Sequence, residues 1–141
     1  MLSCEASISI GASREAIWHV LAAVVTWPEW LPTVTSVEPL DVHALKAGAR
    51  YRVVQPKLRP ATWVVTQLDP ARRFEWESRW PGVRVVADHV IDDTARGATK
   101  VTLRITFSGA FGVLVGLMAR SLTQRYLDQE AAALKSKVEN R

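Results

Sequence analysis

The sequence of 141 residues predicts a single α+β domain in which a curved antiparallel sheet of about seven strands wraps around one long C-terminal helix. Residues 3–10 alternate between apolar and polar side chains, as a half-buried strand does. Short strand-like segments separated by turn-rich stretches then fill the middle of the chain. From Gly112 onward the apolar residues recur with the period of an α-helix. That helix is the only predicted element long enough to cover one face of the sheet.

The N-terminal third is predicted to form a strand, a helix and a short helical turn. Ser13 is a suitable N-cap for a helix of about 12 residues after the first strand. The sequence TWPEWLP, residues 26–32, follows that helix. Pro28 suits the first position of a short helical turn, and Pro32 prevents its continuation.

Six further strands are predicted before the C-terminal helix, with turn-forming residues at their boundaries. Their approximate ranges are 33–40, 48–56, 61–69, 72–80, 83–92 and 98–109. Connections this short favour an antiparallel meander. The helix of about 25 residues that follows has the predicted apolar stripe Leu114, Met118, Leu122, Tyr126, Ala133 or Leu134, and Val138.

The hairpin at residues 73–92 separates the inside of the sheet from the outside. A two-residue turn at Pro81-Gly82 would pair Trp80 with Val83, Ser78 with Val85, Trp76 with Ala87 and Phe74 with His89. The face that carries these residues is apolar apart from Ser78 and His89, and the opposite face is mostly charged. Two polar groups on an apolar face need a protein partner, water or a ligand.

The neighbouring strands extend the inner face. Val101, Leu103, Ile105 and Phe107 point inward in the last strand, and Trp63 and Val65, with Gln67, point inward in strand 61–69. A competing register would instead turn Val64, Thr66 and Leu68 inward. Three indoles on one face are difficult to pack without voids, so we expect a lined pocket between the sheet and the long helix.

The composition and motifs exclude several classes of function. The net charge is +4, but the basic residues are scattered among acids and apolar residues, so we expect no nucleic-acid binding. No metal-ligand spacing, phosphate-binding loop or dinucleotide motif occurs, and we expect neither metal nor cofactor. No segment has the roughly 18 consecutive apolar residues of a membrane span, and Cys4 is the single cysteine. We therefore expect a cytoplasmic protein without stable membrane insertion.

The order of elements resembles the helix-grip fold of the START-like superfamily, also called the Bet v 1-like or polyketide cyclase/dehydrase and lipid-transport family (SRPBCC). The resemblance covers nearly the whole chain. It is carried by Trp30-Leu31-Pro32, Phe74-Glu75-Trp76, Pro81-Gly82, the strand with His89, Gly97-Ala98-Thr99, the Gly109-to-Gly116 entry to the long helix, and Glu130-Ala131-Ala132-Ala133-Leu134-Lys135. Members of this superfamily bind hydrophobic molecules between sheet and helix, and only some are enzymes, so the resemblance implies a cavity rather than a reaction.

The sequence therefore predicts binding of a hydrophobic or aromatic small molecule such as a lipid or polyketide, and it leaves transport or processing of that molecule open. The residues expected to contact it are Trp30, Trp63, Phe74, Trp76, Ser78, Trp80, Val85, Ala87, His89, Leu103, Met118, Leu122 and Tyr126. Two alternatives stay open. One is a polyketide cyclase/dehydrase-type enzyme in which His89 is the general acid or base, and the other is a protein-interaction module.

Two local features complete the prediction. In TWPEWLP, Trp30 is the better candidate to face the cavity, and Trp27 is expected to pack against the first helix. The start of the long helix, residues 112–118, is apolar on all sides, and burial between sheet and loops is the simplest explanation. A mobile gate, a dimer contact or membrane docking are the alternatives. We expect a monomer or a homodimer.

Overall fold

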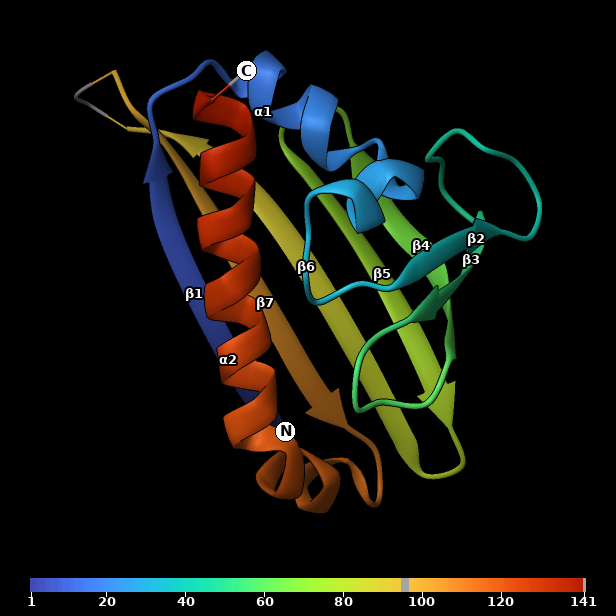
Figure 1. Cartoon of the computed structure of the whole chain (residues 1–141). Helices are drawn as coiled ribbons and strands as arrows, with labels where there is room; N and C mark the ends of the chain where they lie inside the picture. Colours follow the sequence, from blue (N-terminus) through green and yellow to red (C-terminus); the bar gives the residue numbers. More distant parts are fainter. Residues whose placement is uncertain (95–96, 141) are drawn as a thin grey trace.

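The computed structural model describes residues 1–94 and 97–140, and residues 95, 96 and 141 lie outside the described part. In the described residues the fold has seven strands, two α-helices and one 3-10 helix (Figure 1). In chain order they are β1 (Leu2–Ile10), α1 (Arg14–Leu21), η1 (Val24–Glu29), β2 (Ser36–Pro39), β3 (Arg50–Val54), β4 (Ala61–Asp69), β5 (Arg73–Trp80), β6 (Val83–Asp93), β7 (Thr99–Ser108) and α2 (Gly112–Glu139).

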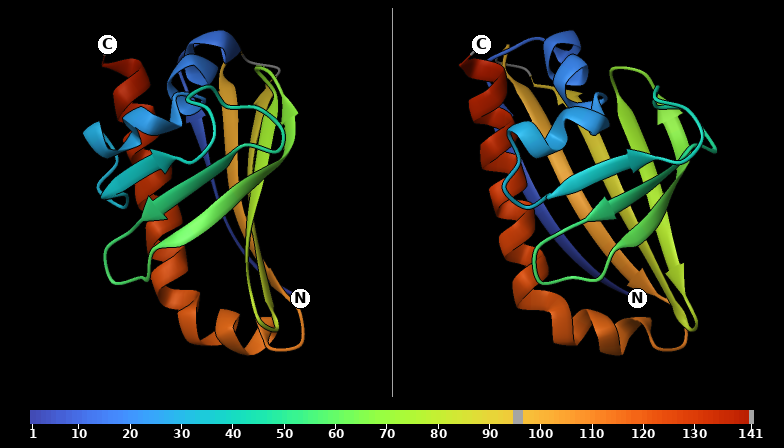
Figure 2. Two further views of the ribbon diagram at one scale, coloured as in Figure 1. Left: turned by 90° about the vertical axis from the view of Figure 1, so that its right-hand side faces the viewer. Right: turned by 45° about the vertical axis from the view of Figure 1, so that its right-hand side comes forward.

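All seven strands belong to one antiparallel sheet with the order β1-β7-β6-β5-β4-β3-β2. The sheet curves around α2, which lies along β1 and β7, while α1 and η1 cover the end near the C-terminus (Figures 1 and 2). This arrangement confirms the predicted α+β helix-grip fold. The buried apolar side chains lie between the concave face of the sheet and the helices. No helix in residues 1–94 and 97–140 is long and apolar enough to cross a membrane.

The first helix is shorter than predicted. Ser13 is its N-cap as expected, and its hydroxyl accepts a hydrogen bond of 3.1 Å from the amide of Ala16. The helix ends after eight residues at Leu21 instead of running for about 12. A separate 3-10 helix then begins at Val24, and Pro28 lies inside it rather than at its first position. This break lets the chain turn so that Trp27 of η1 points toward the sheet.

The hairpin of β5 and β6 has the predicted register. Trp80 pairs with Val83, and the pairing continues without interruption to Phe74 and His89. Gly82 has φ of 77° in the turn, a conformation that favours glycine. The face that carries Phe74, Trp76, Ser78, Val85, Ala87, His89 and Ile91 is buried, but Trp80, at the end of the hairpin, is 44% exposed.

The sequence allowed two registers for β4, which differ in the residues that face inward, and a register shift within the strand combines them. Trp63 and Val65 point inward as predicted. The pairing with β5 is irregular between Val65 and Gln67, so Leu68 pairs with Phe74 and is partly buried. The prediction that Gln67 shares the inner face is therefore wrong, because a β-bulge exchanges the two faces beyond Val65.

The beginning of α2 also differs from the prediction. Leu114, Leu117 and Met118 are exposed, Met118 at 81%, so the expectation that these first turns are buried is wrong. The glycines of this segment face the sheet instead, and a Cβ added at Gly116 would lie 3.0 Å from side-chain atoms of Leu2 and Phe107. The missing side chain allows close approach and turns the large apolar residues outward. In Figure 2 these turns cross the lower end of the sheet before the helix changes direction.

Candidate ligand-binding cavity

Two adjoining chambers lie between the concave face of the sheet and α2. The outer chamber has a volume of about 300 Å³ and the inner one about 50 Å³. They share five lining residues, which are Gln55, Trp63, Ile105, Leu127 and Glu130. An apolar space next to a smaller space with convergent polar groups is typical of small-molecule sites.

The outer chamber is mostly apolar and lies where the loop between β3 and β4 approaches α2. Trp80 and Val85 line it from the hairpin, and Leu122 and Tyr126 line it from the helix. The Tyr126 hydroxyl donates a hydrogen bond to the carbonyl of Pro56 and so connects the helix to the β3–β4 loop. Leu58 and Arg59 of that loop also line the chamber. The loop therefore forms part of the wall of the outer chamber and is held to α2 by this bond.

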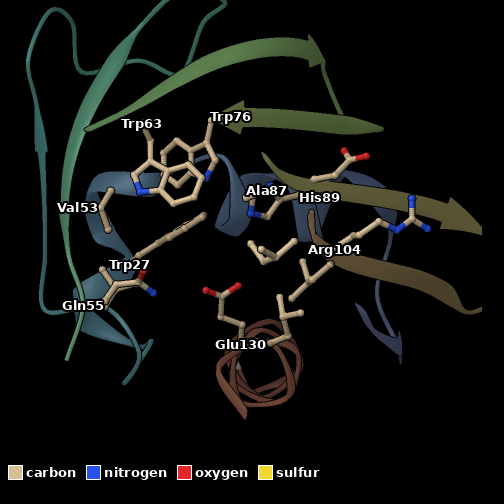
Figure 3. Close-up of a pocket in the computed structure, with 14 residues that line it drawn as sticks. Trp27, Val53, Gln55, Trp63, Trp76, Ala87, His89, Arg104 and Glu130 are labelled. Carbon is tan, nitrogen blue, oxygen red and sulfur yellow. The ribbon is translucent and has the colours of Figure 1, made fainter. Parts of the chain in front are cut away.

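The inner chamber is surrounded by tryptophans from three elements (Figure 3). Trp27 of η1 lies 5.4 Å from Trp76 of β5, and Trp63 of β4 lies 5.8 Å from Trp76, measured between ring centroids. The Trp27 indole donates a hydrogen bond of 3.0 Å to the carbonyl of Leu21, at the end of α1. This bond fixes the indole, so the chamber has rigid aromatic walls.

His89 borders the inner chamber from β6. Its Nδ1 is 3.1 Å from the carbonyl of Phe74, and the two rings stack with centroids 4.0 Å apart. A carbonyl only accepts, so Nδ1 carries the proton and Nε2 has a free lone pair. Burial lowers the pKa of His89 from 6.5 to about 4, against the smaller opposing effect of the Phe74 carbonyl. The ring is therefore neutral at pH 7 and offers an acceptor.

Glu130 enters the inner chamber from α2, with its carboxylate directed toward the tryptophans (Figure 3). Burial raises its pKa from 4.5 to about 7. The nearby Thr33 hydroxyl favours the charged form, although it has no partner in hydrogen-bonding geometry. Among residues 1–94 and 97–140, no Lys, Arg or His forms a salt bridge with this carboxylate.

The sequence contained a signal for Glu130 that was not used. Glu130 follows Leu122 and Tyr126 by multiples of four and precedes Leu134 by four, so it lies on the apolar stripe of α2. An acidic residue in such a stripe marks a buried charge that needs an explanation. Trp27 and Gln55 were also missed as lining residues, because a short 3-10 helix positions Trp27 and a loop after β3 positions Gln55.

Most of the predicted contact residues do line the two chambers. These are Trp63, Trp76, Trp80, Val85, Ala87, His89, Leu103, Leu122 and Tyr126. Trp30 borders only a void of about 10 Å³, whereas Trp27 lines the inner chamber. The preference for Trp30 over Trp27 is therefore wrong, because the break before η1 turns Trp27 toward the sheet.

Three predicted contact residues lie away from the chambers. Met118 is on the solvent-facing side of α2. Phe74 is fully buried behind the His89 ring, and Ser78 is buried opposite Val85 without bordering either chamber. The alternation pattern shows which side chains face inward, but it does not show which of them pack against other side chains and which border a cavity.

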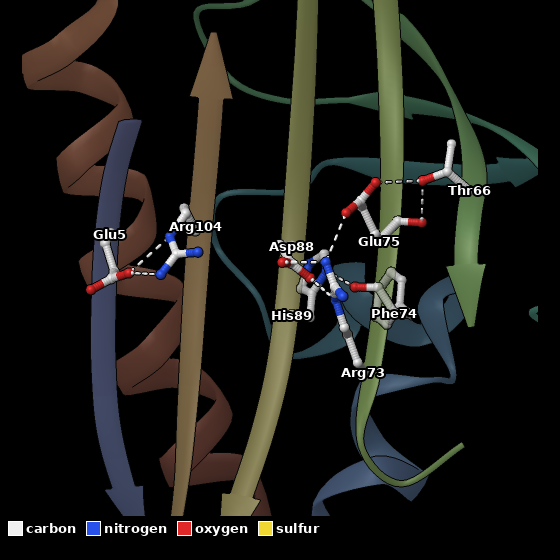
Figure 4. Close-up of polar contacts among 8 residues, drawn as sticks. All are labelled: Glu5, Thr66, Arg73, Phe74, Glu75, Asp88, His89 and Arg104. Carbon is white, nitrogen blue, oxygen red and sulfur yellow. Dashed lines mark hydrogen bonds and ion pairs between the residues drawn. The ribbon is translucent and has the colours of Figure 1, made fainter. Parts of the chain in front are cut away.

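The charged residues of the central strands are paired on the convex face of the sheet. The guanidinium of Arg73 donates to Asp88 at 2.8 and 2.9 Å and to Glu75 at 3.0 Å, and Arg104 pairs with Glu5 (Figure 4). Asp88 and Arg104 border the inner chamber, but these bonds hold their charged ends on the other face. Within the described part of the chain, no three His, Cys, Asp or Glu residues could hold a metal ion together.

Comparison with known proteins agrees with this architecture. No curated protein shows significant sequence similarity to the chain. Among solved structures, an aromatase/cyclase from Streptomyces sp. R1128 is similar over 99% of this chain and 94% of its own, with 20% identity and a TM-score of 0.78. A START superfamily protein from Mycobacterium smegmatis is similar over 98% of this chain and 97% of its own, with 16% identity and a TM-score of 0.74.

A plant enzyme shares the same fold. Norcoclaurine synthase from Thalictrum flavum, solved with dopamine and hydroxybenzaldehyde, is similar over 99% of this chain and 87% of its own, with 14% identity and a TM-score of 0.78. At these identities the structures demonstrate the helix-grip fold of the START-like superfamily and no particular activity. The model of the family described as polyketide cyclase/dehydrase and lipid transport matches residues 1–139, and the chain belongs to that family.

Proposed function

We propose that the protein binds a hydrophobic or aromatic small molecule in the cavity between the sheet and α2. The observation that supports this most strongly is the pair of chambers, of about 300 and 50 Å³, with apolar and aromatic walls. Protein interiors are normally packed without voids of this size. Family membership supports the same proposal.

The chambers also suggest how such a ligand lies. The apolar body fits the outer chamber, where contact with Trp80, Val85 and Leu122 removes it from water. Each buried Å² of apolar surface contributes about 25 cal/mol, so most of the affinity would come from this region. The polar end would lie in the inner chamber, near Glu130 and His89.

Two variants of α2 test the proposal. The probe is N-phenyl-1-naphthylamine, a neutral aromatic compound whose fluorescence rises in apolar surroundings. Leu122→Trp fills the outer chamber, and Leu117→Trp adds the same bulk on the exposed side of the same helix. We expect saturable one-to-one binding that Leu122→Trp weakens at least tenfold and Leu117→Trp leaves intact. Equal binding by both folded variants would contradict a ligand in the cavity.

Purification from the native source tests the same proposal without a chosen probe. Native mass spectrometry of the intact protein should show a bound small molecule, and Leu122→Trp should lose it. Recovery of empty protein, together with no thermal shift across lipid and polyketide panels, would count against small-molecule binding.

A cyclase/dehydrase-type reaction is a second candidate, supported by the two polar groups on opposite walls of the inner chamber. The Glu130 carboxylate, with a pKa of about 7, is suited to remove a proton α to a carbonyl near neutral pH. His89, with a pKa of about 4, is the weaker base and contributes an acceptor from the opposite wall. In a cyclisation, the enolate carbon would then form a bond to a second carbonyl carbon of the ligand, and the alkoxide formed there would take the proton back from Glu130.

Hydrogen–deuterium exchange measures this chemistry directly. Benzoylacetone in D2O should exchange its α-protons faster with the wild type than with Glu130→Gln or His89→Ala, at equal bound fraction. Exchange at the wild-type rate in both variants would remove these two residues from any such reaction, while the binding proposal would stand on its own test.

A further inference from the structure

We propose that the inner chamber holds the ammonium group of a ligand, so that the protein binds an amine with an apolar aryl or alkyl body. This inference rests on the proposed binding function and specifies the ligand's polar end. Its basis is an excess of hydrogen-bond acceptors around a small aromatic space that contains no cation from the described residues.

Three side chains offer acceptors to the chamber. The Nδ1–H of His89 donates to the Phe74 carbonyl, which leaves Nε2 as an acceptor. The amide nitrogen of Gln55 donates to the Thr33 carbonyl at 3.2 Å, which leaves its oxygen as an acceptor. Glu130 adds its carboxylate from the facing helix (Figure 3). A primary ammonium group has three N–H donors and matches this set.

Two buried donors favour Glu130 as a carboxylate rather than a carboxylic acid. The Thr33 hydroxyl and the Trp30 indole nitrogen are buried, and neither has a hydrogen-bond partner among the described residues. Thr33 is close enough to favour the charged form of Glu130, and Trp30 borders a small void together with Glu130. Unpaired buried donors near a carboxyl group favour its ionised form, which accepts at both oxygens, and a buried carboxylate is stabilised by a cation.

The aromatic walls supply the rest of the recognition. Trp27, Trp63 and Trp76 surround the chamber, and indole is the side chain that attracts cations most strongly. The volume of about 50 Å³ accommodates an ammonium group but not a large apolar body. The ligand is thereby oriented with its amine inward and its apolar body in the outer chamber.

The other charged groups do not compete for this position. Arg104 and Asp88 border the inner chamber, but each is paired on the convex face of the sheet. Arg59 lines only the outer chamber. The titratable group that faces Glu130 across the inner chamber is His89, which is neutral above about pH 5 because its pKa is about 4. Amine binding should therefore increase with pH as Glu130 loses its proton.

Three probes with the same body test the inference: 4-phenylbutylamine, 4-phenylbutanol and 4-phenylbutanoate. Calorimetric titration at pH 6 and pH 8 compares the wild type with Glu130→Gln. The matched control is Asp128→Asn, an exposed acid two residues away on the same helix. We expect the amine to bind the wild type at pH 8 at least tenfold more tightly than the alcohol does. This preference should shrink at pH 6, disappear in Glu130→Gln and persist in Asp128→Asn.

The other outcomes separate the inference from the proposed function. Equal or tighter binding of the alcohol at pH 8 would overturn the amine and leave the hydrophobic cavity in place. An amine preference that survives Glu130→Gln would overturn it as well, because surface charge would then be responsible. Tightest binding of 4-phenylbutanoate would place the polar end at Arg59 instead. Failure of all three probes, with no binding of N-phenyl-1-naphthylamine, would overturn the proposed function itself.

Discussion

Glu130→Gln should stabilise the protein, and the gain should depend on pH. The pKa of Glu130 is 4.5 in its ordinary state and about 7 in the folded protein. Below pH 4.5 the group is protonated in both states and contributes nothing. As the pH rises from 4.5 to 7 the unfolded chain ionises first, so the free energy of unfolding falls, and above pH 7 the loss is complete. A difference of about 2.5 pH units, at about 1.4 kcal/mol each, amounts to about 3 kcal/mol.

His89 produces the opposite slope over nearly the same range. Its pKa falls from 6.5 to about 4 on folding, so the unfolded chain binds the extra proton between pH 4 and 6.5. The free energy of unfolding therefore rises over that interval, again by about 3 kcal/mol. The contributions of the two residues nearly cancel in the wild type between pH 4.5 and 6.5. A variant that removes one of the two groups should therefore show the pH dependence of unfolding that the other group causes.

Urea denaturation followed by circular dichroism at pH 4, 5, 6, 7 and 8 measures these slopes. Relative to the wild type, Glu130→Gln should be unchanged at pH 4 and about 3 kcal/mol more stable at pH 8. His89→Asn, which keeps a donor for the Phe74 carbonyl, should lose stability steadily from pH 4.5 to 7. A difference between Glu130→Gln and the wild type that stays constant from pH 4 to 8 would refute the reasoning, since burial would then not shift the carboxyl group.

Three further predictions concern the tryptophans of η1 and its end, the bond between α2 and the β3–β4 loop, and the turn before α2. Trp27→Ala should cost about 3 to 5 kcal/mol in denaturant unfolding, whereas Trp30→Ala, at a partly buried site, should cost less than half as much; equal losses would be inconsistent with the packing. Tyr126→Phe removes the bond from α2 to the β3–β4 loop, so stopped-flow measurements should show faster probe entry and release with about 1 kcal/mol less stability. Unchanged rates would mean that the loop does not control access. Gly109→Ala should destabilise more than Gly48→Ala, because both have positive φ but only at Gly109 would the added Cβ lie 2.6 Å from a backbone oxygen; equal melting temperatures would argue against this close contact.

The regular elements followed from the sequence because their patterns are local. Alternation in β5 and β6, with Pro81-Gly82 between them, was sufficient to predict the register as far as His89. The pattern could not show the β-bulge after Val65, which depends on pairing with a neighbouring strand. It also could not show that Gly116 faces the sheet, which turns Met118 to solvent.

The candidate site was less predictable because its polar groups come from different strands and helices, which only the tertiary structure brings together. His89 was identified from an apolar strand face, but its neutral state depends on burial by other elements, among them Trp27 of η1. Glu130 was on the apolar stripe of α2, yet the sequence alone could not distinguish a buried carboxyl from a solvated one. Trp27 entered the site through the short 3-10 helix, whose direction depends on tertiary packing.

A crystal structure of the protein with 4-phenylbutylamine at pH 8 tests the central claim most directly. We predict that the phenyl ring lies in the outer chamber beside Leu122 and Trp80, and that the amine nitrogen lies within hydrogen-bonding distance of the Glu130 carboxylate. An empty cavity at saturating ligand would contradict small-molecule binding here. A ligand bound with its amine at the mouth of the outer chamber would contradict the role assigned to Glu130.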